Sequence, residues 1–270
     1  MKSSSIHLLK LIYFVLFLNI SHISFAQNTA DDIARYREMI ADGNPSELYE
    51  MAGEELWKKP VGPFNASLEK CDLGLGAGVV DGAAAQLPRY FKDTQRVQDL
   101  ESRLMTCMEK LQGIASKDII EAKFGVGLKK DMDVLVAYIV THSKGQKVKV
   151  SMSHPKEKIM YEMGKKAFYY QAGPFDFSCA SCHAQDGRRI RLQDLPNLTT
   201  HEGAIAGWGA WPAYRVSSGQ FWTMQQRLND CFRQQRVAFP IYGSDVTVAL
   251  SMYMAMNANG GVIQTPGLKR

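Results

Sequence analysis

The amino-acid sequence predicts a mainly α-helical protein made of two helical halves with long ordered loops. Apolar residues recur at helical spacing, most clearly at Leu100, Leu104, Met108 and Leu111. Glycine recurs through the stretch 60–88, where no apolar period is visible, and this pattern predicts a long loop. With 46% hydrophobic and 22% charged residues, the composition is that of a folded globular chain.

The first half is expected to contain four helices. Asn44 and Pro45 suit a helix cap and a first-turn proline, and they start a helix that ends near Trp57. Gly113 is a natural stop for the helix that carries the apolar repeat. The expected helices of this half are 31–40, 45–57, 94–112 and 131–143.

The polar segment 145–153 is the best candidate for the boundary between the halves, and its alternation of lysine with valine also suits a short strand. We therefore expect an N-terminal domain over 27–150 and a C-terminal domain over 151–270. Irregular chain is expected up to Pro212, and Ser244 is the expected cap of the last helix. The expected helices of the second half are 155–172, 219–235 and 244–259.

The segment from Cys179 to His183 forms the motif C-x-x-C-H, the attachment signature of a c-type haem. The two thiols can bond to the two vinyl groups at one edge of a haem, and the histidine can take one axial position on the iron. A zinc site would need a second C-x-x-C or paired histidines downstream, and the sequence has neither. A helix, this motif, a long loop and two further helices are the order expected of a class I cytochrome c domain.

Residues 1–26 predict a secretory signal peptide. Lys2 and Lys10 supply positive charge, the stretch 11–20 is apolar, and the segment ends in the small residue Ala26. The alternative, a membrane anchor, is disfavoured because this stretch is too short to span a bilayer. We therefore expect a periplasmic protein, cleaved after about Ala26 and without stable membrane insertion, in the compartment where c-type haems are attached and disulfides persist.

The charge of the chain is mild. Cleavage after the signal peptide lowers the number of lysines and arginines from 32 to 30 against 27 acidic residues, so the formal charge falls from +5 to +3. This value gives no indication of a nucleic-acid partner. It permits an anionic substrate where positive charge is local. About 244 residues remain, which allows one domain or two.

Three cysteines lie outside the haem motif: Cys71, Cys107 and Cys231. A bond between Cys71 and Cys107 would be a disulfide within the first half, worth about 3–4 kcal/mol in the chain-entropy model. It would leave Cys231 unpaired, and an odd exported cysteine is either intermolecular or reactive. Arg227 lies one helical turn before Cys231 on the same face, and a nearby arginine favours the thiolate. The alternative is an inert buried cysteine beside solvated arginines.

The residues alone leave the second axial ligand of the iron open. A thiolate from Cys231 would lower the reduction potential and would suit a site where the ligand itself reacts. A methionine would give an ordinary electron carrier with a raised potential, although methionines on a helix are more often part of a core. The candidate methionines are Met224, Met252, Met254 and Met256.

Six separated motifs occur in the order found in one known family. They are NASLEKCDLG at 65–74, LPRYF at 87–91, RVQDLE at 96–101, CASCH at 179–183, PAYR at 212–215 and the helix from Arg227 to Cys231. Together they resemble the SoxA family, the catalytic cytochrome c subunits of the SoxAX complex (L-cysteine S-thiosulfotransferase) in bacterial thiosulfate oxidation. The resemblance covers essentially the whole mature chain.

The resemblance implies two cytochrome c-like domains, with one haem c in the C-terminal domain. It implies that Cys179 and Cys182 hold the haem covalently, and that His183 and Cys231 are the axial ligands of the iron. It also implies a disulfide that joins two cysteines of the first half, Cys71 and Cys107.

The resemblance further implies the chemistry and the partners. Cys231 matches the family's catalytic cysteine, which carries a persulfide, and Arg227 matches the arginine that binds the anionic substrate. Thiosulfate would be coupled oxidatively to a cysteine of the SoxYZ carrier, and two electrons would leave through the haem. A SoxX cytochrome would complete a heterodimer.

Some members of the family have a second haem in the first half. Here the segment from Cys107 to Leu111 has neither a second cysteine nor a histidine, so the chain resembles the single-haem type. We interpret His142 and His154 as ordinary residues. Two alternative functions stay open: a simple periplasmic electron-transfer cytochrome c, and a thiosulfate dehydrogenase that joins two thiosulfates into tetrathionate.

Overall fold

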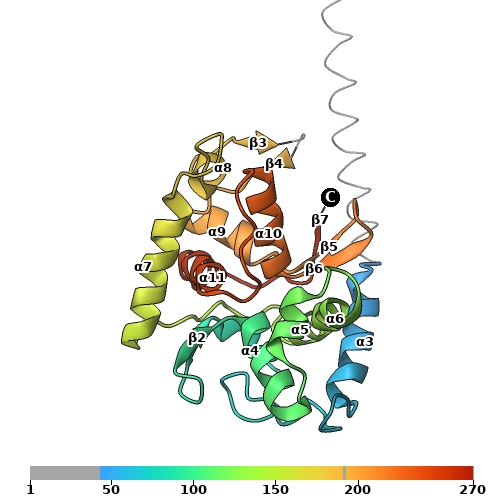
Figure 1. Ribbon diagram of the computed structural model, residues 1–270. Coiled ribbons are helices and arrows are strands. Elements are labelled where there is room, and N and C mark those ends of the chain that lie inside the picture. The colour runs from blue at the N-terminus through green and yellow to red at the C-terminus, as the bar shows by residue number, and fades with distance from the viewer. Residues whose placement is uncertain (1–42, 191–192, 270) are drawn as a thin grey trace, which may run out of the picture. The chain divides into compact units, whose positions relative to one another are not determined.

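The computed structural model describes residues 43–190 and 193–269 (Figure 1). The predicted signal peptide and the predicted helix 31–40 lie outside these residues. From Pro45 onward the chain forms one compact unit, and every contact described below lies within it. No helix of the described ranges is long and apolar enough to cross a membrane.

The helices of the first half enclose one apolar core. Leu104 on α4 and Leu135 on α6 are buried in this core together with Trp57 of α3. Helices α3 and α6 lie side by side. The helical segments of this half are α3 Ser46–Lys58, the 3-10 turn η1 Ala84–Gln86, α4 Leu100–Cys107 with its π-helical continuation η2 Met108–Gln112, α5 Ser116–Glu121 and α6 Gly127–Thr141.

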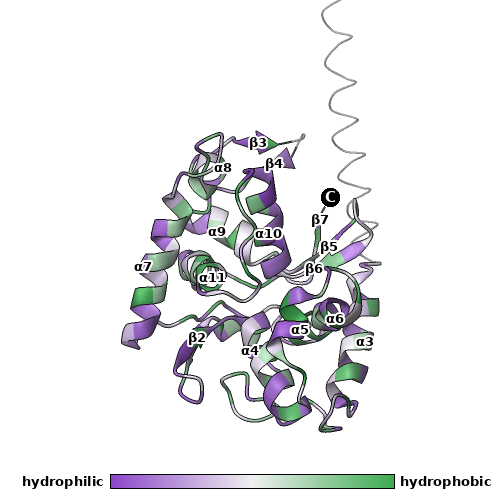
Figure 2. Ribbon diagram, in the orientation of Figure 1, coloured by the Kyte–Doolittle hydropathy of each residue, from purple (hydrophilic) through white to green (hydrophobic). Residues whose placement is uncertain are grey.

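The helices of the second half pack around α11. Every residue of α11 from Thr247 to Ala255 is buried, and Figure 2 shows this helix as mostly hydrophobic. Its main neighbour is α7, which contributes Phe168 to the core. The helices of this half are α7 Pro155–Tyr169, α8 Cys179–His183, α9 His201–Trp208, α10 Met224–Gln234 and α11 Asp245–Asn257.

Short strands form three small sheets in the described part of the chain. Two are hairpins, β1 with β2 and β3 with β4, and the third has the order β6-β5-β7. In this third sheet β7 runs parallel to β5, so the C-terminal residues 267–269 lie beside 213–215. The strands are β1 Arg89–Phe91, β2 Arg96–Gln98, β3 Arg189–Ile190, β4 Gln193–Asp194, β5 Ala213–Arg215, β6 Gln220–Trp222 and β7 Gly267–Lys269.

The predicted helix 94–112 is wrong at its start. Its first residues belong to the β1–β2 hairpin, whose turn holds Gln95 at a φ of 58°. The helix begins at Leu100 because Asp99 and Ser102 form a capping box, in which each side chain accepts a hydrogen bond from the other's backbone N–H. Its end is as predicted, since Gly113 adopts the left-handed conformation at a φ of 74°.

The predicted helix 219–235 also starts too early. Its first residues pair with β5 as strand β6, and α10 begins at Met224 after the cap residue Thr223. The segment 145–153 makes only an isolated bridge. Four other predicted helices are present with shifted ends: 45–57, 131–143, 155–172 and 244–259 correspond to α3, α6, α7 and α11. Helices α5 and α9 were not predicted, because each is too short to show an apolar period.

The same close helix crossing occurs in both halves. A Cβ atom on Gly53 of α3 would overlap the backbone carbonyl of Val134 on α6. A Cβ atom on Gly164 of α7 would likewise overlap the backbone carbonyl of Ala249 on α11. In each crossing the Cβ atom of a tyrosine one helical turn further along is the next neighbour. Only glycine permits two helix backbones to approach this closely, so the two helix pairs share one packing arrangement.

The loop after each glycine-bearing helix repeats as well. Gly62 and Gly173 each begin a Gly-Pro-Phe segment and have φ values of 72° and 74°. Three residues later, Asn65 and Asp176 have φ values of 45° and 49°, which few residues other than glycine adopt. The members of each pair are 111 residues apart. The sequence shows no simple repeat, because identities this sparse become visible only where the backbone is the same.

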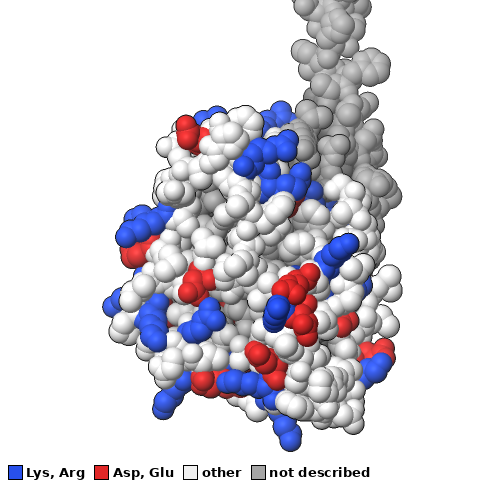
Figure 3. Space-filling model, in the orientation of Figure 1, with Lys and Arg blue, Asp and Glu red and all other residues white. Residues whose placement is uncertain are grey.

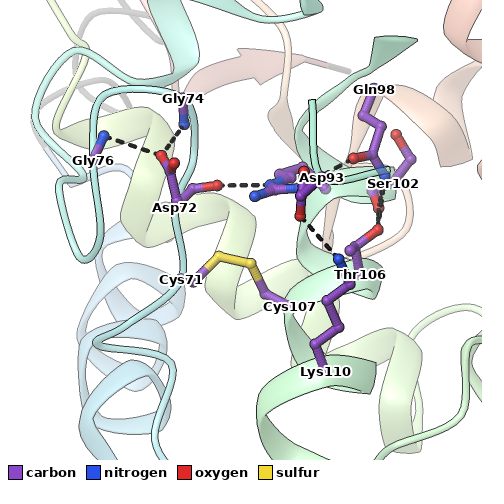
Figure 4. The surroundings of a disulfide bond; sticks show 11 residues. Cys71, Asp72, Gly74, Gly76, Asp93, Gln98, Ser102, Thr106, Cys107 and Lys110 are labelled. Atoms are coloured by element: carbon purple, nitrogen blue, oxygen red, sulfur yellow. Dashed lines mark hydrogen bonds and ion pairs between the residues drawn. A yellow bond between two sulfur atoms is a disulfide. The ribbon is translucent and has the colours of Figure 1, made fainter. Parts of the chain in front are cut away.

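The repeat identifies the counterpart of the haem motif in the first half. At the same offset, the segment 68–72 stands where the second half has 179–183, with leucine in place of the first cysteine and aspartate in place of the histidine. The remaining Cys71 bonds to Cys107 of α4, with the two Cα atoms 5.5 Å apart, so the predicted disulfide is present (Figure 4). The altered motif therefore lies at 68–72 and not at 107–111, where the sequence analysis sought it.

Polar contacts fix the chain beside this disulfide (Figure 4). The Asp72 carboxylate accepts hydrogen bonds from the backbone N–H groups of Gly74 and Gly76 at 2.7 and 3.0 Å. Arg103 donates from Nε to the Asp72 carbonyl at 2.6 Å and pairs with Asp93 at 2.9 Å. The first half thus holds a disulfide and a buried arginine next to its altered motif.

Buried carboxyl groups lie where the two halves meet. Asp99 and Glu101 at the start of α4 and Asp133 of α6 are only 2–3% exposed, and we call these three residues the acid cluster. Burial, together with the nearby Asp99, raises the pKa of Glu101 to about 8. Burial also raises the pKa of Asp133 to about 8. These two carboxyl groups therefore keep their protons at neutral pH.

Stability should fall as the pH rises toward the pKa of Asp133. An unfolded aspartate has a pKa of about 3.9, so the native state binds the extra proton between that value and about 8. The stabilisation is complete below the unfolded pKa and is lost as the pH rises through the folded pKa. We expect Asp133→Asn to flatten the fall of Tm between pH 5 and 9, measured by thermal denaturation. The exposed Asp118→Asn is the control, and equal slopes for Asp133→Asn and the parent would contradict the assignment.

Candidate functional site

The short helix α8 carries the C-x-x-C-H motif. Ser178 caps it through a reciprocal pair of hydrogen bonds with Ser181, at 3.2 and 3.0 Å. This cap fixes the helical turn in which Cys179, Cys182 and His183 follow one another. Both cysteines are free thiols and half-buried.

The hydrogen bond of His183 selects its tautomer. Its Nδ1 atom lies 2.9 Å from the carbonyl oxygen of Pro196. A carbonyl oxygen can only accept, so Nδ1 carries the proton and Nε2 keeps its lone pair. Burial lowers the pKa of His183, and the Arg227 charge adds to this effect, so the imidazole is neutral. A neutral imidazole oriented through Nδ1 is the usual form of an iron ligand.

Cys231 of α10 lies opposite this motif. Burial raises the pKa of its thiol, while the charge of Arg227 acts in the opposite direction, and Cys182 is close enough to raise it further. The Cys231 sulfur in turn raises the pKa of Cys179. One turn beyond Cys231, the Gln235 side chain approaches the Cys179 sulfur at 4.0 Å. The structure therefore brings the two thiols of the C-x-x-C-H motif and Cys231 into one site.

Positive charge converges on Cys231 from two elements. Arg227 lies on α10 one turn before the cysteine, with its guanidinium 5.6 Å from the ring of Trp211. Arg215 of β5 also lowers the pKa of the Cys231 thiol. Lys269 lies opposite Arg215 in the parallel register of β5 and β7. Burial lowers the pKa of Lys269, and Arg227 lowers it further, which indicates that these cations share one region.

Asp230 balances part of this charge. Its carboxylate pairs with Arg227 at 3.0 Å and with Arg233 at 2.6 Å, and it is largely buried. Arg227 is 19% exposed at its side chain, whereas Arg233 is 51% exposed. Figure 3 shows Lys and Arg side chains gathered over α10 and the neighbouring β3–β4 hairpin. The site can therefore bind an anion at Arg227, and the surface around it is electropositive.

The candidate methionine ligands lie in apolar clusters. Met224 and Met254 pack with Phe168 and Leu228 in the core of the second half. Met252 is fully buried in a separate cluster with Val148. These methionines therefore pack as core residues, as is common for methionine on a helix.

The donor set near α8 fits a c-type haem. Two free thiols at C-x-x-C spacing suit thioether bonds, a neutral imidazole with a free Nε2 suits one axial position, and an unpaired sulfur at Cys231 suits the other. Sequence reasoning missed Trp211, Asp230 and Lys269. Asp230 could have been found from its i,i+3 spacing to Arg227, but Lys269 has no local signal because strand pairing brings it to the site.

The helical fold and this donor set define a c-type cytochrome. A family model described as "SoxA/TsdA, cytochrome c domain" matches residues 52–148, which lie in the first half. The chain belongs to the SoxA family: it is 69% identical over 238 residues to L-cysteine S-thiosulfotransferase subunit SoxA of Hydrogenophilus thermoluteolus, covering 88% of this chain and 87% of the relative. It is 37% identical to the subunit of that name from Hydrogenobacter thermophilus, covering 92% of both chains.

A solved structure agrees with this assignment. The crystal structure of SoxXA from P. pantotrophus superimposes with a TM-score of 0.68 at 25% sequence identity. The match covers 84% of this chain and 79% of the other. The predicted mainly helical, cytochrome c-like fold is thereby confirmed.

Proposed function

We propose that this chain is the thiosulfate-oxidising cytochrome subunit of an L-cysteine S-thiosulfotransferase. The observation that carries the proposal is that Cys231 and Arg227, on one helix, lie against the haem motif of α8. The names of the relatives agree with this function. Neither a simple electron carrier nor a tetrathionate-forming enzyme is favoured by any of these observations.

The proposed site residues have separate roles. Cys179 and Cys182 hold one haem c, and His183 and Cys231 are its axial ligands. The haem, when bound, accepts electrons one at a time and passes them on. Arg227 binds the thiosulfate dianion through its forked, permanently charged guanidinium. Cys231 carries the reacting sulfur as a persulfide.

The proposed reaction has two steps. The outer sulfur of the Cys231 persulfide and the outer sulfur of thiosulfate join in an S–S bond, and two electrons leave the site. The thiolate of the SoxYZ carrier then attacks the thiosulfate-derived sulfur, takes the S–SO3 group and returns the persulfide to Cys231. The net change is oxidation of one thiosulfate and one thiol to a cysteine S-thiosulfonate, with one proton and two electrons released.

The repeat supports two cytochrome c-like domains, over 27–150 and 151–270. Each half has a glycine-mediated helix crossing and the same Gly-Pro-Phe loop. The first half has leucine and aspartate where a haem needs cysteine and histidine. We therefore assign a single haem to the C-terminal domain.

The proposed partners and compartment follow from the family. A SoxX-like cytochrome forms a heterodimer with this chain, as the superimposed SoxXA structure suggests. The signal peptide 1–26 sends the protein to the periplasm, where SoxYZ delivers the carrier thiol. Residues 1–26 are removed after about Ala26.

Peptide mapping by mass spectrometry checks the cofactor count and the modification. We expect one haem on the peptide that contains Cys179 and Cys182, a link between the peptides of Cys71 and Cys107 before reduction, and the mass of one extra sulfur atom on the peptide of Cys231. A Cys179→Ala, Cys182→Ala double variant should contain no haem. A second haem elsewhere in the mature protein would refute the single-haem assignment.

Removing Cys231 should abolish turnover. Cys231→Ala is expected to lower carrier-dependent electron release from thiosulfate at least about 100-fold, because the reacting sulfur is gone. The ferric haem should also lose its thiolate-type low-spin signal. Cys231→Met is the matched control: it restores an axial ligand without a reactive sulfur and should stay inactive. Retained activity in Cys231→Ala, or tetrathionate formation without carrier, would rule out the proposed reaction.

Arg227 and Arg233 offer a matched pair, since both bind Asp230 but only Arg227 lies beside Cys231. We expect Arg227→Ala to raise the KM for thiosulfate or lower kcat by about tenfold or more, the usual cost of losing a charge-assisted hydrogen bond. Arg233→Ala should change either constant less than about threefold. Equal effects of the two substitutions would show that general positive charge, and not Arg227, binds the substrate.

A further inference from the structure

The first turn of α10 is held by residues of the other half of the chain. The backbone N–H of Gln225 lies in that turn and has no acceptor within the helix. It donates instead to Oε1 of Glu101, on α4, at 3.1 Å. Both residues are buried, at 1% and 3% exposure, so this bond is not replaced by water.

The side chain of Gln225 adds two more ties. Its Nε2 atom donates to Oδ2 of Asp99 at 2.5 Å, and its Oε1 atom accepts from the backbone N–H of Gly243 at 3.2 Å. Asp99 caps α4, and Gly243 precedes α11. Three elements of the two halves therefore meet at this one glutamine.

Packing alone does not fix this end of the helix. A cavity of about 40 Å³ lies at the junction and is lined by residues that include Glu101, Met224 and Trp211. Such a space has room for about one water molecule. Met224 is the first residue of α10, and Trp211 lies beneath the guanidinium of Arg227. The core residues Met224 and Leu228 pack beneath this turn, but free volume remains beside it, so its hydrogen bonds act together with packing in setting where it lies.

Any displacement of the first turn reaches the site. Arg227 follows Gln225 by two residues and Cys231 follows it by six. At a rise of about 1.5 Å per residue, Cys231 lies roughly 9 Å along the same helix. A helix of 11 residues moves as one body over that distance.

We infer that Glu101 is a positioning residue of the reaction site: its carboxyl group, by accepting the Gln225 N–H, sets the position of Cys231 and Arg227 over the haem motif. This inference rests on the roles proposed above for those two residues. In this role Glu101 acts through α10, by its hydrogen bond to Gln225, and not as a ligand of the haem or the substrate.

Two substitutions distinguish the effect of the length of the Glu101 side chain from the effect of its acidic group. Glu101→Gln keeps the length of the side chain and an acceptor oxygen, and it copies the protonated state that Glu101 has at neutral pH, since its pKa is raised to about 8 by burial. Glu101→Asp keeps the acid but is one methylene shorter. We expect Glu101→Gln to resemble the parent, whereas Glu101→Asp should lower kcat/KM about tenfold and weaken or split the low-spin signal of the ferric haem.

Glu157 provides a matched control. It is also a buried glutamate between the halves, on α7, and its Oε1 atom accepts from the backbone N–H of Tyr90 at 2.9 Å. This bond does not involve α10. We expect Glu157→Asp and Glu101→Asp each to lower Tm by several degrees, but Glu157→Asp should leave the haem spectrum and kcat/KM unchanged.

The outcomes are distinct. A changed spectrum and kcat/KM in Glu101→Asp but not in Glu157→Asp supports the inference. It is overturned if Glu101→Asp lowers Tm only, or if Glu101→Gln disturbs the site as much as Glu101→Asp. If Glu101→Asp yields no haem protein, Gln225→Pro serves as the test, because it deletes the N–H that Glu101 accepts and proline is tolerated in the first turn of a helix. Gln225→Met, which keeps that N–H but also loses the side-chain ties to Asp99 and Gly243, is its control, and equal spectra of these two variants overturn the inference. A parent protein without a thiolate signal would mean failure of the proposed function, not of this inference.

Discussion

The close crossing of two helices at a glycine is the constraint on which the rest of the structure depends. Gly164 lets α7 touch the backbone of α11, and Gly53 does the same for α3 and α6. A side chain at either position would separate the helices and reopen the core. Each crossing also fixes the loop that follows it, and in the second half this loop leads directly into the haem motif. The position of α8 is therefore a consequence of helix packing some fifteen residues earlier.

The two halves share the helix crossing and the loop that follows it, but they differ in the residues at the motif. In the second half the motif keeps two free thiols and a neutral histidine. In the first half one cysteine remains at the equivalent place, and it is consumed in a disulfide to α4. That bond ties down the helix whose first residues, Asp99 and Glu101, accept the hydrogen bonds of α10. The half without the motif thus supports the half that has it.

Burial and positive charge act in opposite directions on Cys231. Burial favours the neutral thiol, while Arg227 and Arg215 favour the thiolate. A sulfur in such a place is half-buried and faces cations that suit an anionic reactant. Asp230 limits this charge by pairing with Arg227 and Arg233, so the site is electropositive without being crowded by unpaired cations.

The sequence by itself determined what depends on local spacing. The motif at 179–183, the helical repeat of 100–111, and the sharing of one helix face by Arg227 and Cys231 are all set by neighbours within a few residues. Helix starts at 94 and 219 were misjudged, because strand pairing and caps at Asp99 and Thr223 override propensity there.

Only the tertiary structure decided which distant residues share the site. Lys269 reaches it through the register of β5 and β7, and Glu101 reaches α10 across the junction of the halves. The internal repeat was also hidden, since it survives in backbone conformation at positions such as Gly62 and Gly173 more than in residue identity. Contacts of this kind result from the packing of whole helices against one another, and no short stretch of sequence contains that information.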